Sequence, residues 1–231
     1  MKTFADKIIS FNESIKYDGP LPHNVSIMNP FKENKEALLT SSNFYKKFYD
    51  DHDKRYLILG INPGRFGAGV TGVPFTDTKR LSEECGFQFS GKPTHEPSAT
   101  FVYEVIKAYG GAKKFYARFY IHSVCPLGFT IINDKGKIIN YNYYDSKELA
   151  EMVYGFIIAN IKKQISFGIS KDVCFCFGTG KNIRFLDKVN EEFRFFKKII
   201  PLEHPRFIMQ YKSKSRQLYV DKYLKEFAQA I

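Results

Sequence analysis

Polar side chains that could act on a substrate follow the ends of short apolar runs in this sequence. Asn62 is the first polar side chain after the run Arg55–Ile61, and it begins a segment rich in glycine and proline that continues to Phe75. Glycine and proline restrict the path of such a segment and let its backbone approach a ligand closely. Asn62 is therefore a candidate for orienting a water molecule or a substrate, although an asparagine before a proline can equally close a local turn.

A histidine follows another apolar run. His204 lies two residues after the run Lys198–Leu202, and Pro205 comes directly after it. A histidine held by the next proline at the end of a strand is unusual in a simple connection. The alternative is an ordinary surface histidine.

The pattern of apolar runs indicates the scaffold that would position these residues. Short apolar runs alternate with stretches of helical periodicity, which favours parallel strands covered by helices on both faces. We therefore predict an α/β fold, a three-layer sandwich with a central four-stranded parallel sheet, whose ligand site lies at the carboxyl ends of the strands. The predicted strands are Arg55–Ile61, Arg118–Val124, Asp172–Phe177 and Lys198–Leu202. The predicted helices are Ser98–Tyr109, Asp145–Ile165, Lys181–Phe193 and one from about Ser215 to the C-terminus.

The chain is predicted to form a single domain over residues 1–231. Its residues are 44% hydrophobic, enough for a sizeable core, and no linker rich in proline, glycine or serine divides them. Residues 1–50 are expected to form a helical cap packed on the rest. Thr130–Tyr141 is predicted to be a hairpin that turns at Asp134-Lys135-Gly136.

Positive charge is concentrated near the end of the chain. The formal net charge is +11, and residues 181–231 hold twelve Lys or Arg against six Asp or Glu. A high lysine content explains part of the total, but the segment His204–Arg216 contains no acidic residue. An acid-free basic loop favours contact with the phosphates of a nucleic acid.

Several classes of protein are disfavoured by the same sequence. The four cysteines include no C-x-x-C pair, and Cys174 and Cys176 alternate within an apolar run, so we expect them in the core rather than on an iron–sulfur cluster. No His, Cys, Asp or Glu cluster has metal-ligand spacing, and we expect no metal and no cofactor. With no export signal and no long apolar stretch, we expect a cytoplasmic protein that does not contact membranes.

Three motifs at the predicted strand ends together resemble a known family. Over about residues 55–228, their order and spacing resemble those of the single-strand-selective monofunctional uracil-DNA glycosylases, within the uracil-DNA glycosylase superfamily. The superfamily has a compact four-stranded parallel sheet between helices, in agreement with the fold predicted above. The motifs are Asn62-Pro63-Gly64 with Phe66-Gly67 and Thr71-Gly72-Val73-Pro74-Phe75, His122-x-x-Cys125-Pro126-Leu127 with Phe129, and His204-Pro205.

The resemblance implies a monofunctional base-excision DNA glycosylase that hydrolyses the N-glycosidic bond of uracil and related deaminated or oxidised bases. Asn62 matches the residue that positions the water. His204 matches the residue that donates a hydrogen bond to uracil O2 as negative charge develops. Phe75 matches the aromatic residue that stacks on the flipped base. Backbone groups of Ile61 and Gly64 are expected to line the base pocket.

The resemblance also implies that the partner is DNA, bound by a monomer that flips the damaged base out of the stack. The segment Phe207-Ile208-Met209 is either a wedge that fills the space left by the base or a fifth strand packed inside. The residues expected to contact the DNA are Ser98, Gly178, Thr179, Lys181, Arg206, Phe207, Lys212, Lys214 and Ser215.

The sequence departs from the family pattern in two segments. The family has an asparagine after the histidine of the second motif, where this chain has Ser123. A hydroxyl is shorter and can both donate and accept, so we expect looser base discrimination, with xanthine or hypoxanthine accepted beside uracil. After His204-Pro205, the family's Ser-Pro-Arg is replaced by Arg206-Phe207-Ile208. This replacement leaves open which residue is the wedge and whether the protein prefers single- or double-stranded DNA.

Two other functions compete with the glycosylase. One is a catalytically inactive DNA-binding or damage-sensing module on the same fold, but the presence of both Asn62 and His204 argues for retained chemistry. The other is a hydrolase of small nucleotides or phosphate esters. Such an enzyme would act on free nucleotides and would benefit little from the basic segment around Lys212 and Lys214.

Overall fold

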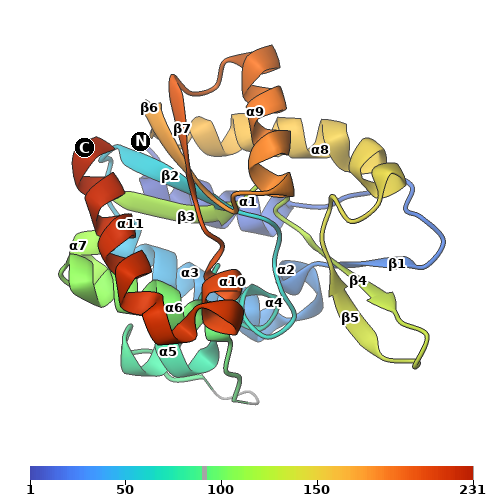
Figure 1. Ribbon diagram of the computed structural model, residues 1–231, viewed down its shortest axis with the longest axis horizontal. Coiled ribbons are helices and arrows are strands. Elements are labelled where there is room, and N and C mark those ends of the chain that lie inside the picture. Colours follow the sequence, from blue (N-terminus) through green and yellow to red (C-terminus); the bar gives the residue numbers. More distant parts are fainter. Residues whose placement is uncertain (90–92, 231) are drawn as a thin grey trace.

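Four parallel strands form the centre of the structure, a computed structural model that describes residues 1–89 and 93–230 (Figure 1). Their order is β3-β2-β6-β7, and every neighbouring pair is parallel. All four carboxyl ends therefore lie at the same edge of the sheet, and the predicted central sheet is confirmed. The strands are β2 (Arg55–Gly60), β3 (Phe119–Ser123), β6 (Ile169–Phe177) and β7 (Lys198–Leu202).

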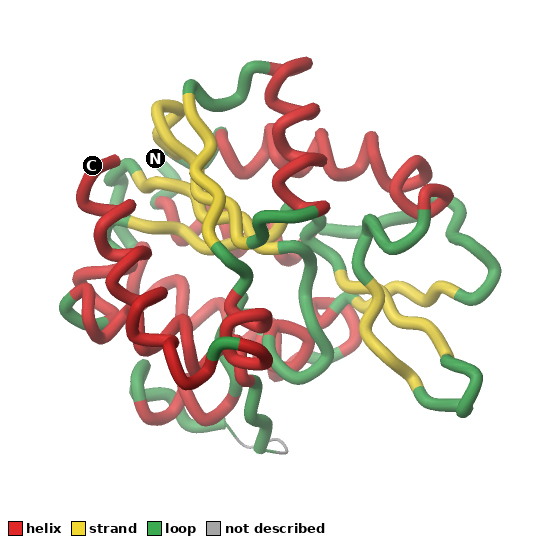
Figure 2. Tube along the Cα trace, viewed as in Figure 1, coloured by secondary structure: helices red, strands yellow, loops and turns green. Residues whose placement is uncertain are grey.

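Helices cover both faces of this sheet (Figure 2). Neighbouring residues of β3 point to opposite faces, as a pleated strand requires. The Phe119 ring lies 4.5 Å from that of Phe227, whereas the Tyr120 ring lies 5.5 Å from that of Phe4. The sheet is thus enclosed between α11 on one face and α1 on the other. The described helices are α1 (Phe4–Ser14), α2 (Pro30–Glu33), α3 (Lys35–Tyr49), α4 (Ala68–Thr71), α5 (Thr78–Glu83), α6 (Pro97–Tyr109), α7 (Ala112–Tyr116), α8 (Lys147–Ile165), α9 (Lys181–Phe193), α10 (Pro205–Tyr211) and α11 (Arg216–Ala230).

A smaller antiparallel sheet projects beside the parallel one (Figure 1). It contains β1 (Val25–Met28), β4 (Gly128–Ile132) and β5 (Ile138–Tyr141), in the order β1-β4-β5. The predicted hairpin is confirmed as β4–β5, with Gly136 in its turn at φ +68°. Strand β1 lies within the N-terminal residues that were expected to be helical. Its four residues are too few to show a period in the sequence, and pairing with β4 determines their conformation.

The segment after β7 is helical, which corrects two expectations. Phe207-Ile208-Met209 is not a fifth strand, and the basic segment is not an open loop, because α10 and a 3₁₀ turn at Ser213–Ser215 occupy most of it. The cause is local. His204 caps the helix by accepting the Arg206 N–H at 3.1 Å, and Pro205 occupies the first helical position, where its missing N–H has no cost.

The cysteines and the helices agree with a protein built around an apolar core. All four cysteines are buried free thiols, and Cys174 and Cys176 lie in β6. Among the described helices, none is long and apolar enough to span a membrane. Within residues 1–89 and 93–230, no three His, Cys, Asp or Glu side chains gather as a metal site would require.

Asn182, in the first turn of α9, joins the carboxyl ends of two central strands. Its buried side chain donates to the carbonyl oxygen of Phe177 at 3.0 Å and to that of Gly60 at 3.4 Å. Its Oδ1 atom accepts a hydrogen bond from the Tyr143 hydroxyl at 2.8 Å. One amide therefore holds β2, β6 and the segment after β5 in a fixed relation.

Asn182→Ala is expected to lower the free energy of unfolding by about 1–3 kcal/mol, because it removes the acceptor of the buried Tyr143 hydroxyl and the side-chain donor to the Phe177 carbonyl. Urea unfolding at neutral pH measures the change. The matched control is Asn24→Ala, which removes an exposed amide and should change stability by less than about 0.5 kcal/mol. Equal losses in the two variants would contradict this account of Asn182.

Candidate active site

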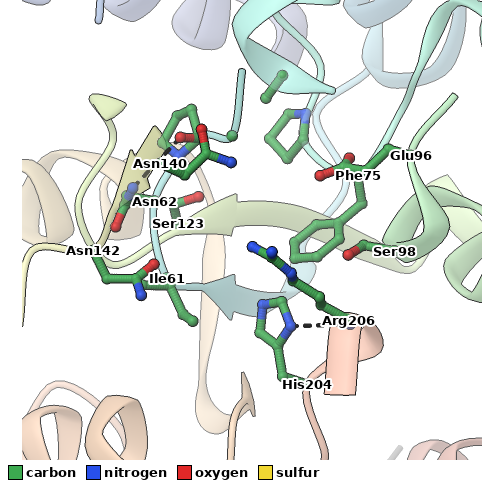
Figure 3. A pocket seen from close by; sticks show the side chains of 14 residues that line it. Ile61, Asn62, Phe75, Glu96, Ser98, Ser123, Asn140, Asn142, His204 and Arg206 are labelled. Atoms are coloured by element: carbon green, nitrogen blue, oxygen red, sulfur yellow. Dashed lines mark hydrogen bonds between the residues drawn. The ribbon is translucent and has the colours of Figure 1, made fainter. Parts of the chain in front are cut away.

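A pocket opens at the carboxyl ends of β2, β3 and β7 (Figure 3). It brings together residues from all three motifs, although they are far apart in the sequence. Three of its polar residues, Glu96, Asn140 and Asn142, were not predicted. The predicted site residues in its wall are Ile61, Asn62, Gly64, Phe75, Ser98, Ser123, His204 and Arg206.

The Asn62 side chain is held by the backbone at the end of β5 and just after it. Its Oδ1 atom accepts the Tyr143 N–H at 3.1 Å, and its Nδ2 atom donates to the Tyr141 carbonyl at 3.2 Å. These partners lie 79 and 81 positions along the chain, so the side chain does more than close a local turn. The two bonds determine which way the amide points. An amide oxygen has two lone pairs, so Oδ1 can still accept a hydrogen bond from a water molecule.

His204 is half-buried and neutral at physiological pH. Burial and the positive charge of Arg206 lower its pKa to about 4. Its Nδ1 atom accepts the Arg206 N–H, so in the neutral ring the proton is on Nε2. The ring can therefore donate one hydrogen bond into the pocket without carrying a charge.

Phe75 has a strained backbone, with a φ of +53° that non-glycine residues rarely adopt. Its ring packs edge-on against Phe177 at 5.2 Å and lies 5.8 Å from the His204 ring. A Cβ atom on Gly60 would lie 2.7 Å from the Phe75 ring. Because Gly60 at the end of β2 has no side chain, the Phe75 ring can occupy this space, and its packing against Phe177 holds it in the pocket wall despite the backbone strain.

Two serines complete the inner wall. Ser123 is the last residue of β3 and is buried, and Ser98 is buried in the first turn of α6. Ser98 was expected among the residues that contact DNA, and the structure brings it to the same pocket as the base-pocket candidates.

Glu96 is an acidic residue in the pocket that sequence reasoning missed. Its carboxylate packs against the loop after β2, since Oε2 occupies the space that a Cβ of Gly67 would need. Among the described residues, none donates a hydrogen bond to this carboxyl group. Burial and the Asp77 carboxylate raise the pKa of Glu96 to about 7, and Arg206 acts in the opposite direction.

Asn140 and Asn142 reach the pocket from the end of the antiparallel hairpin. Asn140 accepts the Arg65 N–H through Oδ1 at 3.1 Å, and its Nδ2 atom lies 3.4 Å from where a Cβ of Gly64 would be. The Glu96 Oε1 atom lies at the same distance from that point. A Cβ atom on Gly64 would therefore be in van der Waals contact with both a carboxyl group and an amide.

The remaining candidates for DNA contact do not line the pocket. Gly178 is buried in the turn after β6, where its N–H donates to the Leu202 carbonyl at 2.7 Å. Lys181 lies over the Tyr144 ring at 5.8 Å. Candidates outside the pocket wall are Gly178, Thr179, Lys181, Phe207, Lys212, Lys214 and Ser215.

The basic segment gains an acidic partner in three dimensions. Arg216 forms an ion pair with Glu104 of α6, with Nε 2.9 Å from the carboxylate. Lys214 and Arg216 share a shallow groove with Glu104 and Lys107. The absence of acidic residues from His204–Arg216 in the sequence therefore overstates the local positive charge.

Comparisons with known proteins agree with the motifs and the fold. The family model described as the uracil DNA glycosylase superfamily matches residues 46–228. The crystal structure of wild-type SMUG2 from Pedobacter heparinus is similar over 99% of this chain and 98% of that one, with 59% sequence identity and a TM-score of 0.97. No match was found among the curated proteins compared.

Glu96→Gln is expected to change how stability depends on pH. With its pKa raised from 4.5 to about 7, Glu96 binds a proton in the folded protein that the unfolded chain does not bind at the same pH. The free energy of unfolding of the wild type should therefore decrease by roughly 2 kcal/mol as the pH rises from 4.5 to 7 and Glu96 loses its proton. This decrease should be absent in the glutamine variant. Urea unfolding across this pH range measures the difference. Glu148→Gln, an exposed change on α8, should keep the wild-type profile, and a Glu96→Gln profile like the wild type's would contradict the assignment.

Proposed function

The chain belongs to the uracil DNA glycosylase superfamily and is a DNA glycosylase, and from that premise we propose that it releases uracil and other deaminated bases held between Asn62 and His204. The observation that carries this proposal is the neutral, half-buried His204 with its donor on Nε2, in one pocket with the oriented Asn62 amide. A neutral donor and a neutral amide suit a reaction in which charge appears only as the bond breaks.

The roles follow from the chemistry of the bond. The C1′–N bond breaks with both electrons going to the base, so the sugar becomes positive and the base negative. His204 donates a hydrogen bond to the base O2 atom as its charge grows, a contribution of about 3–4 kcal/mol when one such donor is removed. Asn62 accepts a hydrogen bond from the water that adds to C1′, and the water's proton passes to solvent. The amide orients this water and is too weak a base to deprotonate it.

The pocket wall supports binding of a flipped base. The Phe75 ring offers a stacking surface, a contact of about 1–3 kcal/mol per base, and Ile61 and Gly64 contribute backbone groups. Ser123 is buried at the end of β3, where a hydroxyl can donate or accept. This dual capacity supports a range that includes xanthine or hypoxanthine beside uracil.

DNA would extend from the pocket across the surface of α10. Phe207 is 42% exposed and Tyr211 65% exposed, with ring centroids 5.4 Å apart, while Ile208 is buried beneath them. An exposed aromatic pair beside the pocket supports Phe207 as the wedge that replaces the flipped base. Lys212, Lys214 and Ser215 follow it and could contact phosphates, as could Ser98, Arg206 and the Gly178–Lys181 turn.

We further propose that the enzyme acts as a monomer, with residues 1–231 forming one domain. Contacts of the N-terminal residues support the single domain, since β1 pairs with β4 and the Phe4 ring of α1 packs on Tyr120 of β3. The buried free thiols suit a reducing compartment such as the cytoplasm.

A panel of oligonucleotides tests the function. Single- and double-stranded DNA bearing uracil, hydroxymethyluracil, xanthine or hypoxanthine is incubated with the protein and cleaved with alkali at the abasic site. The wild type should release uracil and at least one deaminated purine from the DNA. Asn62→Ala and His204→Gln should each lose roughly 10²–10³-fold in rate while still binding DNA. Binding without release by the wild type would favour the inactive DNA-binding module, and strict uracil specificity would contradict the role given to Ser123.

Salt dependence tests the basic segment. Replacing Lys212 and Lys214 with glutamine should weaken DNA binding for every sequence and reduce the slope of log K against log salt by about 1 for each phosphate that the variant no longer neutralises. Fluorescence anisotropy from low to moderate salt measures the slope. Replacing Lys113 and Lys114 of α7, next to the amino end of β3, is the matched control. An unchanged slope in the Lys212/Lys214 variant would remove this segment from the DNA-binding surface.

A further inference from the structure

Arg206 occupies the pocket rather than the outer surface alone. The sequence placed it among the residues that contact DNA phosphates, but it lines the same pocket as Asn62 and His204. In Figure 3 its side chain extends from α10 into the pocket, toward the rings of Phe75 and His204. His204, which caps α10, lies two positions before Arg206 in the sequence, and its ring accepts a hydrogen bond from the Arg206 N–H.

The Arg206 charge has no acidic partner at contact distance within the described part of the chain. Three other arginines do form ion pairs, Arg55 with Asp51, Arg80 with Asp77, and Arg216 with Glu104. The field of Arg206 nevertheless acts on both sides of the pocket, because it lowers the pKa of His204 and opposes the rise in that of Glu96. The Arg206 guanidinium has no ion-pair partner among the described residues and lies in the same pocket as the neutral His204 ring, so it is available to a negative ligand.

We propose that Arg206 is a catalytic residue whose guanidinium stabilises the negative charge on the departing base. The inference rests on the proposed glycosylase reaction and deepens it. When the C1′–N bond breaks, the electron pair stays on the base, and the anion spreads this charge over its ring nitrogen and carbonyl oxygens. The guanidinium acts on that charge together with the hydrogen bond from His204, and the base is later protonated by solvent.

The side-chain type suits this role. Arginine stays charged at all working pH values and is less strongly hydrated than lysine, so it can enter a partly closed pocket. Its effect is electrostatic and requires the charge to develop, so it favours the transition state over the bound neutral base. The substrates favoured are bases that leave as stable anions.

The test compares uracil with 5-fluorouracil, whose fluorine withdraws electrons and makes the base a better leaving group. Single-turnover release is measured at saturating enzyme for the wild type, Arg206→Gln and Arg206→Lys. Arg206→Gln should slow uracil release by about 10²-fold and 5-fluorouracil release by less, so that the ratio of the 5-fluorouracil rate to the uracil rate rises. The release rates of Arg206→Lys, which keeps the charge, should lie between those of the wild type and Arg206→Gln. Arg118→Gln makes the same change beside the amino end of β3, away from the pocket, and should match the wild type.

The outcomes separate this role from the alternatives. If Arg206 only contacts a phosphate, Arg206→Gln should slow release of both bases equally, and the effect should disappear at saturating enzyme. Equal slowing of both bases at any enzyme concentration overturns the proposal. An unchanged rate on both bases overturns it as well. Thermal unfolding of each variant shows whether it is folded, which is expected because the residue is exposed. If the wild type releases neither base, the proposed function itself fails. If it releases uracil but the rate ratio is unchanged in Arg206→Gln, only the role of Arg206 fails.

Discussion

The parallel pairing of β2 with β3 and β6 is the constraint on which the whole site depends. Gly60 is level with Ser123, and Leu59 is level with Cys176, so the chain leaves each strand at one edge of the sheet. Residues more than a hundred positions apart can meet there without any long connection across the core. Because β2 ends in a residue without a Cβ atom, the Phe75 ring can lie across the strand end, and the pocket gains a flat apolar wall.

Burial at this edge determines the charges in the pocket. Removing water disfavours charged forms, which keeps His204 neutral and raises the pKa of Glu96 toward neutrality. Among the described residues that line the pocket, Arg206 is the one that carries a guanidinium. In the proposed reaction, a neutral His204 donor beside the Arg206 guanidinium would favour an anionic base over a neutral one, and that difference would accelerate bond cleavage.

Much of the fold followed from local sequence, and the rest required tertiary contacts. The apolar runs predicted β2, β3, β6 and β7 because buried parallel strands need apolar residues on both faces. The three motifs, at the ends of β2, β3 and β7, identified Asn62 and His204 as candidates. Glu96 and Asn140 could not be found this way, because each reaches the pocket only when a separate element packs beside the β2 loop. Helix α10 was misjudged because three apolar residues have no measurable period, although the His-Pro pair carried a helix-start signal.

The antiparallel sheet outside the core has a direct part in the orientation of Asn62. Its amide is bonded to backbone groups of Tyr141 and Tyr143, and the Tyr143 hydroxyl is bonded in turn to Asn182 at the start of α9. A continuous set of hydrogen bonds therefore joins β6, the segment after β5 and the Asn62 amide. Arg206 is different, because its exposed side chain is free of such bonds within the part of the chain that the structure describes. In the proposed reaction, the Asn62 amide held by these bonds would orient the water, and the guanidinium, which no such bond from a described residue fixes, would act on the charge of the departing base.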